Sequence, residues 1–369
     1  MNKVNKEQGI KIVNSHNEWD TLEEVIVGRL EHAMFPSWNT INAATIPPIA
    51  QESIKKLYER AGKPYPIEVI KAAQQELETF VNILNSEGII VRRPDVFDFS
   101  LPFSTPKWRV QNGFCSANPR DIFLVVGDEI IETPTADRGR YFETWAYRSL
   151  LKYYFLNGAK WTSAPKPQLL DNLYDFKYEE PPEQDEMRYI ITEFEPTFDA
   201  ADFLRCGKEI FVQKSHVTNE FGIKWLQRHL GTEYTIHIIE TNCRQPLHID
   251  TTIAFLGKGK LLINPEFIDK RKLPDIFSNW DVFEAPKPIS FYTKSSKIKV
   301  VSDWMSLNVL MLDENRVVVE KNQEPMIRFL KNIGLKPIVC PFENYYPFGG
   351  SFHCATLDIR RRSKLESYF

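Results

Sequence analysis

Two apolar runs joined by an acidic turn stand in the stretch Ile122-Phe123-Leu124-Val125-Val126-Gly127-Asp128-Glu129-Ile130-Ile131. Apolar residues on both sides of a short turn are typical of a tight β-hairpin. A second stretch of the same form runs from Val309 to Val319 around Asp313-Glu314-Asn315. Together they predict a weakly repeated hairpin unit.

Three more β-rich apolar runs lie at residues 24–28, 209–212 and 260–263. Between the strands, apolar residues recur at helical spacing, and the clearest such stretch is 67–86, with Pro66 before it and Gly88 after it. Further helices are expected at residues 142–155, 221–230 and 325–333. Strands separated by helices predict a mixed α/β fold.

Two stretches interrupted by prolines, residues 100–119 and 164–186, fit neither pattern. We expect them to form long ordered loops or surface insertions rather than linkers between domains. The chain is therefore interpreted as a single domain, residues 1–369, with a flexible N-terminus at residues 1–12.

The composition argues against several classes of protein. Of the 369 residues, 43% are apolar and 26% are charged, as in ordinary globular proteins. The 46 Lys and Arg against 49 Asp and Glu give a net charge of -3, so no overall positive field attracts nucleic acid or an anionic membrane. The expected partner is a small molecule or another protein.

The chain has five cysteines, an odd number, and no C-x-x-C pair. This pattern suits neither a disulfide framework nor a zinc ribbon. The N-terminal residues lack the apolar segment of a signal peptide, and no run approaches the roughly 20 apolar residues of a membrane span. We therefore expect a soluble, cytoplasmic protein. The five cysteines are Cys115, Cys206, Cys243, Cys340 and Cys354.

A histidine and a carboxylate stand two residues apart in His248-Ile249-Asp250. In an extended strand, residues i and i+2 face the same side, so the two side chains would share one pocket. The simpler interpretation is a loop histidine paired with a nearby acid.

A thiol follows a glycine pair in Gly349-Gly350-Ser351-Phe352-His353-Cys354. Glycines allow a close approach of backbone and ligand, which would put Cys354 at the floor of a pocket. If the segment is extended, His353 faces away from Cys354, and His248 is the better base. A thiol with an ordinary pKa of about 8.5 needs a positive neighbour or a cationic substrate to ionise. The alternative is a buried, inert cysteine.

Four acids lie among apolar and aromatic residues in the segment 193–203, and buried acids need partners. They could orient a histidine, bind a cationic ligand or cap the backbone. Asp121 precedes a predicted strand, where it could face a pocket or cap the strand. A zinc site made of His248, Asp250 and Cys354 is disfavoured because these residues lack a familiar ligand spacing.

Motifs along nearly the whole chain resemble those of the arginine-dependent amidinotransferases, the family of the glycine and inosamine-phosphate enzymes. They include Leu22-Glu23-Glu24-Val25-Ile26-Val27-Gly28-Arg29, Phe198-Asp199-Ala200-Ala201-Asp202-Phe203, His248-Ile249-Asp250, Ser306-Leu307-Asn308-Val309-Leu310-Met311-Leu312-Asp313 and Phe352-His353-Cys354. The resemblance implies the pentein fold, a five-bladed pseudo-symmetric α/β propeller around a narrow channel. We also expect a homodimer.

By motif match, Cys354 resembles the family's nucleophile, His248 its general acid and base, and Asp199 the carboxylate that orients His248. The resemblance implies that Cys354 attacks the guanidinium carbon of L-arginine and that ornithine leaves. A primary amine then collects the amidino group from the sulfur in a ping-pong reaction. No cofactor and no metal are expected.

Asp121 and Asp250 match the acids that grip the guanidinium, and Ser306 matches a serine that lines the same pocket. Carboxylates suit this role because the guanidinium group is a planar cation that carries several N–H donors.

The sequence departs from the family at two places that affect specificity. Leu247 replaces a methionine, and residues 266–271 stand where an arginine that binds the donor carboxylate is expected, with Lys270 and Arg271 as candidate replacements. We therefore expect an acceptor bulkier than glycine, as in family members that build guanidino toxins and antibiotics in bacteria. An arginine-hydrolysing pentein of the deiminase type and a non-catalytic pentein that binds a guanidino ligand remain the alternatives.

Overall fold

Short strands make up five three-stranded sheets in the computed structural model, which describes residues 11–46, 50–291 and 300–369. In chain order the strands of these sheets are β1 (Leu22–Val27), β2 (Ile90–Arg92), β5 (Phe123–Val126), β6 (Glu129–Glu132), β7 (Lys160–Ser163), β8 (Phe203–Cys206), β9 (Glu209–Val212), β10 (Thr235–Ile238), β11 (Ile253–Gly257), β12 (Lys260–Ile263), β13 (Asp281–Glu284), β14 (Leu310–Met311), β15 (Arg316–Glu320), β16 (Lys336–Cys340) and β17 (Thr356–Arg361). A separate two-stranded sheet pairs β3 (Phe103–Ser104) with β4 (Arg109–Val110).

All five sheets share one pairing pattern. The central strand pairs antiparallel with one neighbour and parallel with the other. In four sheets the antiparallel pair is a hairpin of consecutive strands, as in β5–β6 and β14–β15. In the fifth, β1 pairs antiparallel with β17 from the other end of the chain. The two hairpins predicted from the sequence are therefore confirmed.

A parallel pair needs a crossover connection between its two strands. In four of the sheets this connection contains one or more α-helices. The connection between β12 and β13 uses the short 3-10 helices η8 (Lys270–Lys272) and η9 (Asp275–Phe277) instead. The α-helices of these crossovers are α1 (Thr40–Thr45), α2 (Gln51–Arg60) and α3 (Ile67–Ser86) between β1 and β2, α5 (Arg148–Leu156) between β6 and β7, α6 (Glu220–Leu230) between β9 and β10, and α7 (Glu324–Asn332) between β15 and β16.

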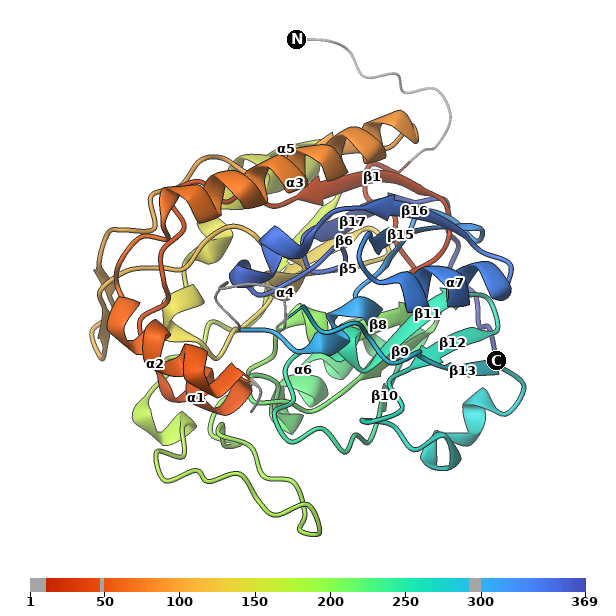
Figure 1. Ribbon diagram of the computed structural model, residues 1–369. Helices are drawn as coiled ribbons and strands as arrows, with labels where there is room; N and C mark the ends of the chain where they lie inside the picture. The colour runs from red at the N-terminus through yellow and green to blue at the C-terminus, as the bar shows by residue number, and fades with distance from the viewer. Residues whose placement is uncertain (1–10, 47–49, 292–299) are drawn as a thin grey trace.

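Helix α3 shows why these crossovers are helical. Its buried residues include Ile70, Ala73, Leu77 and Leu84, which recur at three- and four-residue spacing and form one apolar face. The helix lies along the outside of the sheet that contains β1 and β17 (Figure 1). Its predicted bounds, 67–86, agree with the structure.

Two of the expected secondary-structure elements need revision. The helix expected at residues 142–155 begins as the 3-10 helix η3 (Glu143–Tyr147) before α5 starts at Arg148. The expected loop 100–119 contains the short pair β3–β4. Most of the N-terminal segment expected to be flexible, residues 1–12, lies outside the described residues. Within the described ranges, no helix is long and apolar enough to cross a membrane.

Candidate active site

Short turns stand directly before one strand of each three-stranded sheet, and they carry the polar residues of the site. The turns contact one another in chain order, from α4 through η5 and η7 to η11. Asp121 lies in α4 (Pro119–Ile122) before β5, Asp199 precedes η5 (Ala200–Asp202) before β8, His248 and Asp250 lie at η7 (Ile249–Thr251) before β11, Asn308 follows η11 (Asp303–Leu307) before β14, and Cys354 precedes β17.

The turns meet at a cavity of about 540 Å³. Five of the six predicted site residues line it, namely Asp121, Asp199, His248, Asp250 and Cys354. All five are buried. Residues from four separate segments of the chain are thus brought to one enclosed space.

Ser306, the sixth predicted residue, is buried but is not among the residues that line the cavity. Its neighbour Leu307 packs into an apolar core, because the last residues of η11 turn toward the interior. The serine of this segment that lines the cavity is Ser302, whose side chain accepts a hydrogen bond from the backbone N–H of Trp304.

Cys354 has both a donor and an acceptor beside its sulfur. The Asn308 side-chain amide donates to Sγ with Nδ2 at 3.1 Å, and the thiol donates to Asp250 Oδ2 at 3.3 Å. Burial, followed by the charge of Asp250, raises the pKa of Cys354 to about 12, although a hydrogen bond with His248 opposes the rise. Without a cationic ligand in the cavity, the protonated thiol is therefore favoured.

His248 lies between two carboxylates. Its Nε2 is 3.1 Å from Asp199 Oδ2, and its Nδ1 is 3.6 Å from Asp121 Oδ1. Burial alone would lower the pKa of His248, but Asp121, Asp199 and the Cys354 thiol together raise it well above its ordinary value. The imidazole is thus held as a cation, as a proton donor to a leaving group requires.

The strand geometry expected for His248 and Asp250 is wrong, although both side chains line the cavity. The backbone of His248 has φ 61°, in the left-handed region that non-glycine residues seldom adopt. Asp250 then lies in the 3-10 helix η7 rather than in a strand. A tight turn, not an extended segment, delivers both groups, and such strained positions are common at functional sites.

Two charged residues at the site were missed by the sequence analysis. Arg140 lines the cavity, and its guanidinium lies 2.9 Å from Asp121 Oδ2 and 2.6 Å from Glu143 Oε2. Burial raises the pKa of Glu143 to about 7, partly offset by Arg140. Nothing in the local sequence pattern of residues 138–147 indicated these contacts.

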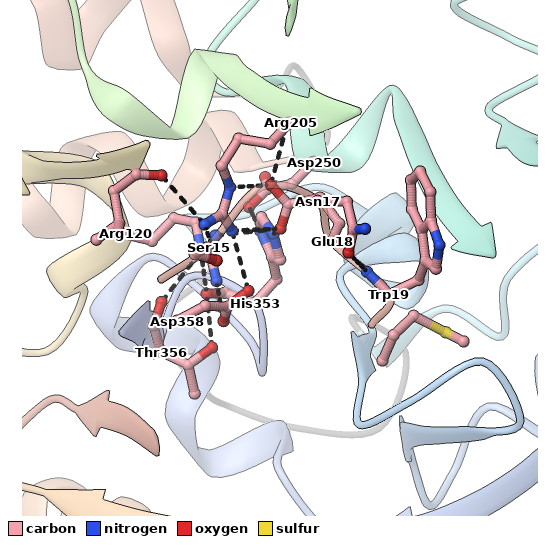
Figure 2. A network of polar contacts seen from close by, with 12 residues as sticks. Ser15, Asn17, Glu18, Trp19, Arg120, Arg205, Asp250, His353, Thr356 and Asp358 are labelled. Carbon is pink, nitrogen blue, oxygen red and sulfur yellow. Dashed lines mark hydrogen bonds and ion pairs between the residues drawn. The ribbon is translucent and has the colours of Figure 1, made fainter. Parts of the chain in front are cut away.

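Behind Asp250 lies a buried network of polar side chains (Figure 2). His353 Nδ1 is 2.9 Å from Asp250 Oδ2, and His353 Nε2 is 3.4 Å from Glu18 Oε2. Glu18 accepts two hydrogen bonds of 2.8 Å from Arg205, which also bonds Asp358. Burial alone would raise the pKa of Glu18, but Arg205, His353 and Arg120 hold it well below its ordinary value. His353 thus supports Asp250, and among the described residues its ring pairs with Asp250 and Glu18 rather than with the sulfur of its neighbour.

Gly350 permits a close approach, as the glycine pair suggested. A Cβ atom at this position would lie 2.6 Å from Cys354 Cβ and 2.8 Å from Asn118 Oδ1. The groups that come close are therefore protein atoms rather than a ligand. A side chain there would displace the nucleophile.

Comparison with known proteins identifies the family. The L-arginine:L-lysine amidinotransferase of Pseudomonas savastanoi pv. phaseolicola is 52% identical over 356 residues, which cover 96% of each chain. The mitochondrial glycine amidinotransferase of Gallus gallus is 44% identical over 97% of this chain and 85% of its own length. The chain belongs to the amidinotransferase family. No family model matches it.

Solved structures show the same relationship for this amidinotransferase. SxtG, an amidinotransferase of the saxitoxin biosynthetic pathway from Microseira wollei, is 60% identical with a TM-score of 0.94, over 97% of this chain and 99% of SxtG. Inosamine-phosphate amidinotransferase StrB1 from Streptomyces griseus is 35% identical with a TM-score of 0.86, over the same shares. DDAH from Pseudomonas aeruginosa, at 14% identity and a TM-score of 0.52 over 91% of this chain and 99% of its own, shares the fold alone. The fold is of the pentein type.

Neither candidate for the donor-carboxylate site lines the cavity of this amidinotransferase. Lys270 donates to the backbone carbonyl of Val282, and Arg271 pairs with Asp269 on the surface. The lysine that does line the cavity is Lys287. The expectation for Lys270 and Arg271 fails because η8 directs these side chains away from the cavity.

Proposed function

We propose that this amidinotransferase moves the amidino group of L-arginine to an acceptor amine through a covalent amidino-Cys354 intermediate and releases ornithine. The observation that carries the proposal is the convergence of a buried thiol, a histidine and three carboxylates on one cavity. The names of two relatives, an arginine:lysine amidinotransferase and a saxitoxin-pathway enzyme, support a role in the biosynthesis of a guanidino toxin or antibiotic.

Carboxylate oxygens without a hydrogen-bond partner support the binding of a cation. Oδ1 of Asp121, of Asp199 and of Asp250 is buried, and each lacks a hydrogen-bond partner in the described part of the chain. Such oxygens are costly to bury unless a ligand satisfies them. The planar guanidinium of arginine carries enough N–H donors to do so. We assign Asp121 and Asp250 to the guanidinium because both act on the thiol that must attack it.

The first half-reaction begins when the guanidinium binds beside Cys354. Its positive charge favours the thiolate, and the thiol proton leaves to solvent. The sulfur lone pair forms a C–S bond with the guanidinium carbon, and the C–N bond to the δ-nitrogen of ornithine breaks. His248 as imidazolium gives its proton to that nitrogen, so ornithine leaves as a neutral amine and the amidino group stays on sulfur.

The second half-reaction uses the same groups in reverse. An acceptor amine enters the cavity as the free base, its lone pair attacks the amidino carbon, and its nitrogen gives one proton to neutral His248. The C–S bond breaks, the guanidino product leaves, and the thiolate takes back a proton. Asp199 keeps His248 oriented in both halves, since its Oδ2 lies 3.1 Å from Nε2.

Water would hydrolyse the intermediate to citrulline, which is the outcome expected of the deiminase type. The buried position of Cys354 and His248 supports transfer, because a closed site excludes water from the amidino carbon. The loops 100–119 and 164–186 are the proposed covers of the site.

The acceptor is proposed to be bulkier than glycine. Leu247 and Phe267, two of the positions at which the sequence departs from the family pattern, both line the cavity. Large apolar side chains favour an acceptor with an aliphatic portion over a small, fully polar amino acid.

We further propose that the five sheets are the five blades of a pseudo-symmetric propeller within a single domain, 1–369, and that the protein forms a homodimer. The shared pairing pattern of the five sheets supports the first proposal. Analytical ultracentrifugation would test the second.

One assay separates transfer from its alternatives. The protein is incubated with L-arginine alone and with glycine, lysine, longer diamines or amino sugars. Acceptor-dependent ornithine supports transfer, citrulline supports a hydrolase, and the absence of both supports a non-catalytic binding protein. Mass spectrometry of samples quenched without acceptor tests for the amidino group on the Cys354 peptide.

A further inference from the structure

Asn308 lies just before β14, in the sheet formed by β14, β15 and β16. Its side chain makes three contacts at the turn that carries the reacting sulfur. Its Oδ1 accepts hydrogen bonds from the backbone N–H of His353 at 3.0 Å and of Cys354 at 3.2 Å. Its Nδ2 donates to Cys354 Sγ at 3.1 Å. Asn308 is buried.

The contacts fix which way the amide faces. Two backbone N–H donors require the oxygen on their side, because an NH₂ group cannot accept from them. The NH₂ group must then face the sulfur. One side chain therefore holds the turn that carries the nucleophile and aims a donor at its reactive atom.

We propose that Asn308 is a further catalytic residue, whose amide donates a hydrogen bond to the Cys354 thiolate and fixes the turn that presents it. This inference rests on the proposed function, since it assigns Asn308 to the step in which Cys354 becomes the nucleophile.

The surroundings of the sulfur explain why such a donor is needed. Asp250 and Asp121 oppose the thiolate, His248 favours it, and Tyr345 also interacts with it electrostatically. When the thiol ionises, it loses its own hydrogen bond to Asp250. The Asn308 amide can stay in place, because its donation does not depend on the thiol proton.

Asn308→Asp is the most specific test. The aspartate keeps the shape and the oxygen that accepts the two backbone N–H groups, but it replaces the donor that faces the sulfur with a negative charge. At pH 8, well below the thiol pKa, the rate of alkylation by iodoacetamide is proportional to the thiolate fraction. We expect the Cys354 peptide to be alkylated about 10- to 100-fold more slowly than in the wild type, and the amidino-enzyme to form from arginine with a similar loss in rate.

Asn219→Asp is the matched control. Asn219 is also buried, and its side-chain oxygen also accepts two backbone N–H groups, from Thr197 and Gly222, but it caps α6 away from the cavity. The Asn219→Asp variant should lose thermal stability without a change in the rate of Cys354 alkylation. If Asn308→Asp does not fold, Asn308→Ala removes the same donor to the sulfur, together with the oxygen that accepts the two backbone N–H groups.

Alkylation needs neither arginine nor an acceptor, so this test stands apart from the proposed function. An alkylation rate in folded Asn308→Asp or Asn308→Ala that equals the wild-type rate would overturn the role of Asn308. A wild-type protein that never forms the amidino adduct would instead overturn the proposed function.

Discussion

The sulfur of Cys354 lies 3.3 Å from Oδ2 of Asp250, so the proposed nucleophile donates its proton to a carboxylate. This carboxylate opposes ionisation of the thiol until a cation neutralises it. In the proposed mechanism, the same side chain restrains the thiol of the free enzyme and binds the substrate guanidinium that releases the restraint.

Asp250→Asn should therefore make the substrate-free thiol more reactive. Removal of the nearest negative charge lowers the pKa of Cys354, and one pKa unit is a tenfold change in thiolate below the pKa. We expect alkylation of Cys354 by iodoacetamide at pH 8 to rise by about tenfold, while ornithine release from arginine falls. Asp303→Asn, at another cavity-lining acid, is the control and should leave the alkylation rate unchanged. A slower reaction in Asp250→Asn would contradict the role assigned to this carboxylate.

Cys354→Ala should abolish ornithine release and leave the fold intact. The change removes the nucleophile but little buried volume, so thermal unfolding should shift only slightly. Cys243→Ala is the matched control, because Cys243 is another buried thiol that lines the same cavity. Ornithine formation by Cys354→Ala would end the covalent mechanism.

Asp199→Asn should reduce kcat far more than it changes the KM for arginine. The amide that replaces the carboxylate no longer supports the imidazolium, and loss of general acid–base catalysis costs about 10²- to 10⁴-fold. Asp121→Asn should chiefly raise the KM for arginine, with some loss of kcat because Asp121 also lies near His248. Steady-state kinetics of both variants with one acceptor would reveal a reversed pattern if the two roles are exchanged.

Glu18→Gln should destabilise the fold strongly. It breaks the buried pair with Arg205 and leaves that cation without its main partner, which costs about 3–5 kcal/mol. Urea unfolding monitored by tryptophan fluorescence measures the loss. Asp269→Asn, which breaks the exposed pair with Arg271, should leave the unfolding midpoint unchanged. Equal midpoints for Glu18→Gln and the wild type would mean that the network does not hold the centre of the molecule together.

Glu320→Gln should change how stability depends on pH. Burial raises the pKa of Glu320 from 4.5 to about 7, so the folded state binds this proton more tightly than the unfolded state. Its contribution is full below about pH 4.5 and is lost as the pH rises to about 7, a difference of about 3 kcal/mol. The variant should gain stability relative to the wild type across that window, as measured by urea unfolding. Glu324→Gln, an exposed acid on α7, should track the wild type, and a parallel curve for Glu320→Gln would refute the shift.

Local patterns predicted the hairpins and α3, because their buried residues follow the period of the element that they form. The third strands were harder to recognise. In β7, β10 and β13 the residues at both ends are exposed and the middle pair is half-buried, so no apolar run marks them. Their place in the sheets is set by the parallel pairing with a buried central strand.

The sequence predicted only part of the candidate site, namely the residues that lie in short motifs. The residues in short motifs, such as His248 and Cys354, were found because the motif itself names them. Arg140 lies in no such motif, and Asn308 lies in the motif 306–313 but bonds Cys354 across 46 positions. Spacing along the chain carries no information about such a contact.

The pairing of β1 with β17 has a consequence for how the enzyme is made. Cys354 stands two residues before β17, and this strand pairs with β1 (residues 22–27) and with Asn14, near the other end of the described chain. A ribosome must therefore translate almost all of the chain before the thiol turn can be anchored, and such distant pairing is slow to form. Among the residues that line the cavity, Cys354 is thus the last to be synthesised.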